Sequence, residues 1–209
     1  AKLRRAAQEA LDYLRVVPDV AQAEVFMASN TNLLARLSYT SHIPSNGVEE
    51  PKSLESFGVG IRVIFKGSGQ IKFGFGSETS DLSSLGVQEA LRKARASALY
   101  DPEFVSLPLL GSRPRRSVAS HHDPQLMRIS NGNLVELGWA VVDGCLEAFQ
   151  SFEELLNWAR TPEAIPDLGL ILTGDVMVLQ ERIAIGNTAQ QHVLVDESAL
   201  ITSVATSMI

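Results

Sequence analysis

A run of alternating residues near position 60 constrains the fold more than any other feature of this sequence. Its apolar members share one parity: Phe57, Val59, Ile61, Val63 and Phe65. After Gly67-Ser68-Gly69 the alternation resumes with Ile71, Phe73 and Phe75. A period of two with aromatic and β-branched residues is typical of half-buried strands. The sequence therefore predicts a β-hairpin over residues 57–77 with one aromatic, β-branched face.

Helical and extended segments surround this hairpin. Apolar residues recur at three- and four-residue steps from Leu3 to Val17, and Pro18 ends that helix. We expect further helices after Ser80-Asp81, from Asn133, and from Ser151 to Thr161-Pro162. Extended segments are predicted over residues 23–40, 168–179, 181–187, 192–196 and 198–208.

These elements indicate an α+β protein with a mainly antiparallel sheet flanked by helices, followed by a second, partial β-rich domain. Residues 101–131 contain four prolines and little periodicity, which is unusual for a connector inside a compact domain. We therefore expect an N-terminal α+β domain over 1–100 and a connector over 101–131. Residues 132–209 would form a helix and the start of the second domain.

Composition excludes several classes of protein. The 209 residues are 45% hydrophobic and 20% charged, as in folded globular proteins. The net charge of -6 disfavours nonspecific nucleic-acid binding, and no run of about 18 apolar residues suggests a membrane span. Cys145 is the only cysteine, which excludes an internal disulfide and fits a reducing, cytoplasmic location.

Motifs for catalysis are absent from the sequence. It has no HExxH helix, no phosphate-binding P-loop and no GxGxxG turn, so we assign no catalytic or cofactor-binding residue. His121 and His122 are the only candidates for metal ligands. Because adjacent side chains rarely face the same way, we expect a solvated loop there and no metal site.

Other conspicuous residues have structural explanations. The glycines between positions 58 and 76 are expected to serve strand twist, a tight turn and close backbone packing. Cys145 lies on the apolar side of its predicted helix, and Trp139 and Trp158 are expected to pack in the core or at a domain interface. Arg113, Arg115 and Arg116 are expected to lie in a solvated loop, with an acidic partner as the alternative.

Several strings, in order, resemble the N-terminal half of the TldD/PmbA family, also called modulators of DNA gyrase. The strings are Ala23-Glu24-Val25-Phe26, the stretch 55–63 (an "ES-x-G-x-G-x-R" strand), Gly74-Phe75-Gly76 with Thr79-Ser80-Asp81-Leu82, Asp101-Pro102, His122-Asp123-Pro124, and the stretch 181–188 with Asp196-Glu197-Ser198. A predicted helix over 151–166 departs from the family pattern. The family's HExxxH helix would lie beyond Ile209, so no metal-binding residue transfers to this chain.

The resemblance implies one of two functions. The chain would be the scaffold or substrate-chamber portion of a metal-dependent peptidase involved in proteolysis and peptide maturation, inactive alone, with zinc bound only outside it. The alternative is a non-catalytic, PmbA-like partner or binding module. The resemblance also implies a homo- or heterodimer with a family member, and no membrane or nucleic-acid partner. From the apolar segment 198–209 we expect an uncovered strand edge, and a parent protein about twice this long.

Overall fold

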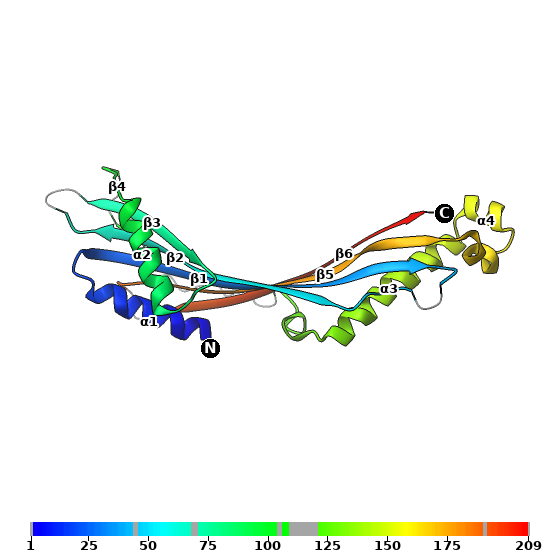
Figure 1. Cartoon of the computed structure of the whole chain (residues 1–209), viewed down its shortest axis with the longest axis horizontal. Coiled ribbons are helices and arrows are strands. Elements are labelled where there is room, and N and C mark those ends of the chain that lie inside the picture. The colour runs from blue at the N-terminus through cyan, green and yellow to red at the C-terminus, as the bar shows by residue number, and fades with distance from the viewer. Residues whose placement is uncertain are drawn as a thin grey trace. The chain divides into compact units, whose positions relative to one another are not determined.

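The computed structural model describes residues 2–43, 46–67, 71–103, 106–108, 121–189 and 192–208. The helices and strands are, in order, α1 (Lys2–Val16), β1 (Val20–Thr40), β2 (Lys52–Phe65), β3 (Lys72–Thr79), α2 (Ser84–Ala96), β4 (Leu99–Tyr100), η1 (Leu126–Arg128), α3 (Asn131–Gln150), α4 (Glu153–Ala159), η2 (Pro162–Leu168), β5 (Ile171–Asn187) and β6 (Leu194–Met208) (Figure 1). The strands form an antiparallel sheet in the order β4-β3-β2-β1-β5-β6. The predicted α+β class, with helices flanking this sheet, is confirmed.

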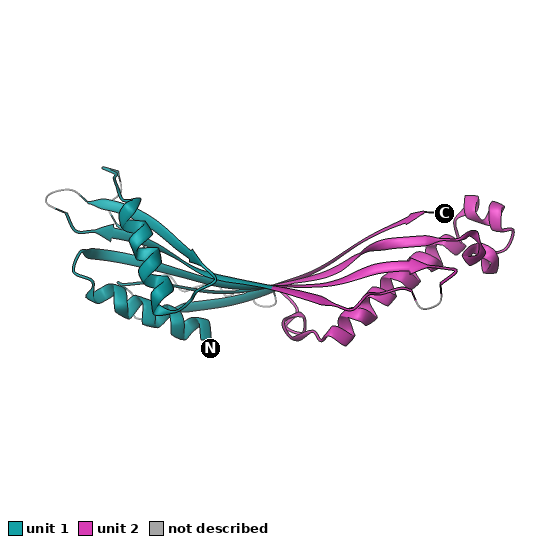
Figure 2. Ribbon diagram, in the orientation of Figure 1, with its two compact units in different colours: residues 1–30, 55–121, 181–198 teal, residues 31–54, 122–180, 199–209 magenta. Residues whose placement is uncertain are grey.

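The chain forms two compact units, and each is assembled from three separate segments (Figure 2). Unit 1 comprises residues 1–30, 55–121 and 181–198, and unit 2 comprises residues 31–54, 122–180 and 199–209. β1, β2, β5 and β6 therefore contribute residues to both units. The predicted domains 1–100 and 132–209 are consecutive ranges, whereas these units interleave. The predicted domain boundaries stay a prediction. The C-terminal strands, expected to begin a second domain, join the same sheet as β1.

The predicted hairpin is present, and β2 carries its apolar face as expected. Val59, Ile61 and Val63 are buried, and β3 pairs antiparallel with β2 in a register that places Val63 opposite Gly74 and Ile61 opposite Gly76. On β3, however, the expectation that Phe73 and Phe75 continue the buried face is wrong, since Phe75 is 54% exposed. The glycines of β3 occupy the buried parity instead.

The reason for this reversal is the close approach of α2 to β3. A Cβ atom on Gly74 would overlap the Ala94 carbonyl oxygen, and one on Gly76 would overlap that of Ala90. Only glycine leaves room for the backbone of a helix at this distance. The expected role of these two glycines in close backbone packing is therefore confirmed.

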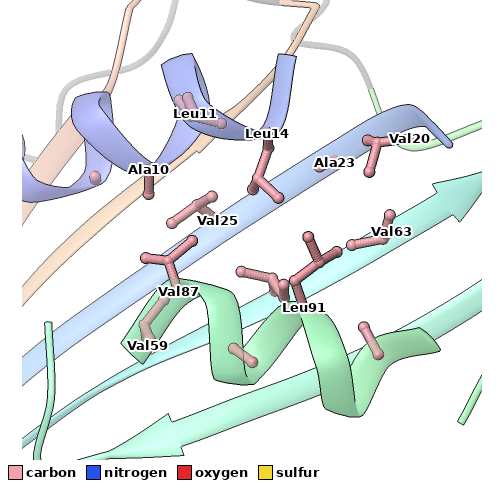
Figure 3. Packing of buried hydrophobic residues seen from close by; sticks show 14 of the residues in the cluster. Ala10, Leu11, Leu14, Val20, Ala23, Val25, Val59, Val63, Val87 and Leu91 are labelled. Atoms are coloured by element: carbon pink, nitrogen blue, oxygen red, sulfur yellow. The ribbon is translucent and has the colours of Figure 1, made fainter. Parts of the chain in front are cut away.

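Two helices cover one face of the unit 1 sheet. Leu11 and Leu14 from α1 meet Val87 and Leu91 from α2 over the strand residues Val25, Val59 and Val63 (Figure 3). Each of these leucines is no more than 1% exposed. Full burial of one such side chain contributes about 2 kcal/mol to stability, so this cluster positions the helices.

Unit 2 is built around α3, which packs on β1 and β5. Its core contains Leu134 and Val142 from the helix, Leu37 from β1 and Val176 from β5. The helix begins after Ser130, whose side chain accepts a hydrogen bond from the Asn133 backbone amide. The predicted start at Asn133 is therefore two residues late, because Ser130 caps the helix by satisfying a free amide of the first turn.

The later boundaries also differ from the prediction in detail. Ser151 was expected to start a helix, but it ends α3, and its hydroxyl donates to the Ala148 carbonyl oxygen. α4 begins at Glu153 instead. The segments predicted as 168–179 and 181–187 form one strand, β5, and those predicted as 192–196 and 198–208 form β6.

Candidate functional site

The principal candidate site is a cavity of about 990 Å³ in unit 1, which we call the unit 1 cavity. It lies where the first turn of α1 meets parts of β1, β2, β5 and β6. Its lining residues are Lys2, Leu3, Arg4, Ala6, Ser29, Glu55, Phe57, Leu82, Arg182, Ile183, Val195, Asp196 and Glu197. The volume is at the upper end of the range that small-molecule sites occupy, about 300–1,000 Å³.

Phe57 is the aromatic residue among those that line this cavity. It shares the parity of the buried face of β2 but is 41% exposed, while Val59 beside it is 2% exposed. The backbone carbonyl of Phe57 accepts a hydrogen bond of 2.7 Å from the Ser80 amide, which fixes the strand at this point. The aromatic side chain is therefore held open to the cavity by a well-anchored strand.

Leu82 enters the cavity from the turn that precedes α2. The Ser83 amide donates to Asp81 Oδ1 at 2.7 Å, and the Ser83 side chain caps the helix by accepting from the Leu85 amide. The hydrogen bonds from Ser83 lower the pKa of the Asp81 carboxyl, which therefore stays ionised and keeps the turn in place. This turn fixes the position of Leu82.

Charged side chains of both signs lie around the apolar lining. Arg182 Nε lies 3.7 Å from a Glu197 side-chain oxygen. His121 Nε2 lies 2.9 Å from the Glu197 backbone oxygen and 3.7 Å from Asp196 Oδ1. The other charged residues that line the cavity are Lys2 and Arg4 on α1 and Glu55 on β2. The arrangement combines an apolar surface with separate cationic and anionic groups.

The two candidate metal ligands, His121 and His122, are consecutive residues, and His121 Nε2 lies beside β6. Among the residues that the structure describes, no three His, Cys, Asp or Glu side chains come close enough together to hold a metal ion. The donor set therefore does not fit zinc, which needs three or four such ligands.

The other residues singled out from the sequence lie outside the unit 1 cavity. Cys145 is half-buried and packs against the unit 2 core, and Trp139 lies against the backbone of Gly47. Trp158 is 63% exposed, so its expected packing is not found. Arg113, Arg115 and Arg116 fall outside the described residues.

Sequence reasoning missed the residues that line the cavity. Glu55, Arg182 and Asp196 were noticed only as parts of strings that resemble a family. They come from β2, β5 and β6, which meet through pairings between distant parts of the chain. One sequence feature pointed to the cavity. Phe57 stands at the start of the alternating run, and Glu55 lies two residues before it.

A second feature is the edge strand β6, which ends the sheet on one side. Residues 198–208 contain no charged residue, glycine or proline, and residues 200–208 are exposed throughout. Leu200, Val204 and Met208 are 58%, 70% and 63% exposed, respectively. Natural edge strands are normally protected by charge, proline, a bulge or a covering element. β6 carries charge near its start, at Asp196 and Glu197, but residues 198–208 have neither charge nor proline.

Comparisons with known proteins bear on these features. Residues 45–98 match the family model of the PmbA/TldA metallopeptidase domain 1. The resemblance to the TldD/PmbA family is confirmed. The matched range contains β2, β3 and α2, with the hairpin and the close glycine packing. No curated protein matches the sequence.

Two solved structures share the fold. A protein of Bacteroides thetaiotaomicron named as a modulator of DNA gyrase aligns with a TM-score of 0.58 and 13% identity over 96% of this chain. TldE from Thermococcus kodakarensis aligns with a TM-score of 0.52 and 13% identity over 99% of this chain. The alignments cover 40% and 42% of those proteins, so the chain spans about two fifths of their length.

The sequence predicts no membrane-spanning helix. Within the described residues, no helix combines the length and the apolar character that crossing a bilayer requires.

Proposed function

We propose that this chain is the N-terminal scaffold of a TldD/PmbA-like, metal-dependent peptidase of the cytoplasm. The observation that carries the proposal is the match of residues 45–98 to a metallopeptidase first domain. The scaffold would help to enclose a chamber in which peptides are processed. The cleavage site itself would lie outside this chain.

The arrangement of possible metal ligands in the described residues supports a scaffold role for this chain. A metallopeptidase activates water on a metal that three or more side chains hold. The described residues bring no such set together. Zinc would therefore be bound by other residues of the complete peptidase.

The uncovered edge supports a role in assembly. β6 offers backbone amides and carbonyls along one side and apolar side chains along its length. A second chain of the same fold would cover both by adding a strand to this edge. Because residues 198–208 carry no charge, two copies of the segment could pair without electrostatic repulsion.

Association tests this proposal directly. We expect the sedimentation-derived mass of the chain to approach that of a dimer as its concentration rises. Val204→Lys should weaken this association by about tenfold or more, since it places a charge on the apolar edge. Leu99→Lys is the matched control, because Leu99 is 74% exposed on β4 at the other end of the strand order. A monomer at every concentration would contradict the proposal.

Activity gives a separate prediction. The purified chain with added zinc should not cleave a mixed fluorogenic peptide library, because its described residues bring no set of three metal-donor side chains together. Cleavage that a chelator abolishes and that His121→Ala with His122→Ala also removes would contradict the assignment of the chain as a scaffold.

A further inference from the structure

We propose that α4 and its neighbours form a docking surface for an arginine-rich helix of a partner protein. This surface, which we call the α4 surface, consists of two aromatic residues and four carboxylates: Phe152, Trp158, Glu147, Glu153, Glu154 and Glu163. The unit 1 cavity is lined by other residues. The inference concerns a protein that docks on the folded chain, so it depends neither on the peptidase assignment nor on the pairing of β6.

The two aromatic side chains of the α4 surface are largely exposed to solvent. α4 buries Leu155, which is 5% exposed, but Trp158 is 63% exposed, and Phe152 at the N-cap is 53% exposed. Trp158 is the most exposed aromatic residue in the described part of the chain. Aromatic side chains dominate the energy of many protein interfaces, because covering them removes a large apolar area from water. Two of them on one short helix therefore indicate a contact with another protein.

Carboxylates from three elements accompany these aromatic residues, since α4 packs against both α3 and η2 (Figure 1). Glu147 lies in the last turn of α3, Glu153 and Glu154 lie in the first turn of α4, and Glu163 lies in the first turn of η2. All four residues are exposed. α4 has seven residues and is about 10 Å long, so its glutamates lie within one short helix of Trp158.

The charge of this region identifies the partner as basic. Residues 131–168 contain seven carboxylates and one arginine, and their net charge of -6 equals that of the whole chain. None of these seven carboxylates forms an ion pair with a residue that the structure describes. In unit 1, by contrast, Asp19 pairs with Arg95 and Glu78 pairs with Lys93. A partner with opposite charge would complement the α4 surface and be steered to it.

The combination of an indole ring with carboxylates favours arginine over lysine in that partner. A guanidinium group stacks on the face of a tryptophan ring and also pairs with a carboxylate through two parallel hydrogen bonds. Trp158 follows Glu154 by four residues, so these side chains are neighbours on the same face of α4. One arginine of the partner would contact both. A helix with leucines beside its arginines would also cover Phe152.

The test uses a helix of about four turns, blocked at both ends and built from leucine, alanine and arginine, with a lysine version and a glutamate version for comparison. Fluorescence anisotropy should show saturable binding of the labelled arginine helix to the chain. Raising the salt concentration from about 0.05 to about 0.5 M should weaken this binding about tenfold, because the charges are screened. The lysine helix should bind about threefold to tenfold more weakly, and the glutamate helix should not bind.

Variants of the α4 surface place the binding. Trp158→Ala should weaken binding of the arginine helix by about tenfold, and so should the double variant Glu153→Gln with Glu154→Gln. All three side chains are exposed, so these variants are expected to keep the fold.

The matched controls lie in unit 1 and should leave binding unchanged. Tyr100→Ala removes an aromatic side chain that is 52% exposed on β4. Asp101→Asn with Glu103→Gln removes two exposed carboxylates, as the double variant of α4 does. The proposal is overturned if the arginine helix does not bind, if the lysine helix binds equally well, or if the controls weaken binding as much as the α4 variants. None of these results bears on cleavage or on association through β6, so this proposal and the proposed function fail separately.

Discussion

Asp19 ties three elements together at the turn between α1 and β1. Arg95 Nε donates to Asp19 Oδ2 at 2.8 Å, and Arg95 Nη2 donates to Oδ1 at 2.9 Å. The Lys66 amide donates to the Asp19 carbonyl oxygen, which links the same turn to the end of β2. The hydrogen bonds from Arg95 lower the pKa of the Asp19 carboxyl below its ordinary value.

This shift gives stability a specific dependence on pH. Because the folded-state pKa is depressed, the stabilisation is complete above the unfolded pKa of about 4 and is lost as pH falls through the folded value. Both side chains are nearly half exposed, so we expect Asp19→Asn to lower the free energy of unfolding by about 0.5 kcal/mol at pH 7. Urea unfolding should show this difference shrinking at pH 3. An equal loss at both pH values would contradict the assignment to the ion pair.

At the scale of whole elements, the packing of α2 on β3 depends on Gly74 and Gly76. Any side chain at Gly76 would overlap the Ala90 carbonyl oxygen, which belongs to helix backbone and cannot rotate away. The helix would have to shift from the sheet, exposing Val87 and Leu91, which are at most 2% exposed.

We therefore expect Gly76→Ala to lower the free energy of unfolding by about 2 kcal/mol or more, as overpacked sites do. Gly144→Ala is the control, since no atom lies within 4 Å of its Cβ position in α3. There alanine should be neutral or stabilise by up to about 1 kcal/mol, through the higher helix propensity of alanine. Thermal or urea unfolding of both variants gives the comparison. Equal effects of the two substitutions on the free energy of unfolding would mean that α2 does not pack closely on β3.

Elements with strong local periodicity were predictable, and their partners were not. The alternation from Val59 to Phe65 identified β2 because one face of that strand is buried from Val59 onward. The same logic failed for β3, where a helix backbone replaces side-chain packing and glycine occupies the buried parity. The pairing of β1 with β5 brings distant parts of the chain together, and no local pattern encodes it. Ala23 and Thr188, just after β5, are hydrogen-bonded although they lie 165 positions apart. The cavity lining depends on that pairing, so it could not be predicted.

At the scale of the whole molecule, we propose that this fold serves as a scaffold whose edge is covered by a second chain. The segment 198–208 is hydrophobic enough to pack but is uncovered in one chain. An edge strand bonds to its neighbour through alternate amides, and the remaining amides face solvent. Coverage by a second strand would protect those remaining amides from exchange with solvent.

Hydrogen exchange along β6, followed by mass spectrometry at low and high protein concentration, measures this coverage directly. We expect exchange of residues 199–208 to slow at high concentration, while exchange of β4 at the other end of the strand order is unaffected. Val204→Lys should abolish the slowing. Rapid exchange of residues 199–208 at every concentration, identical in the variant and the unaltered chain, would contradict the account.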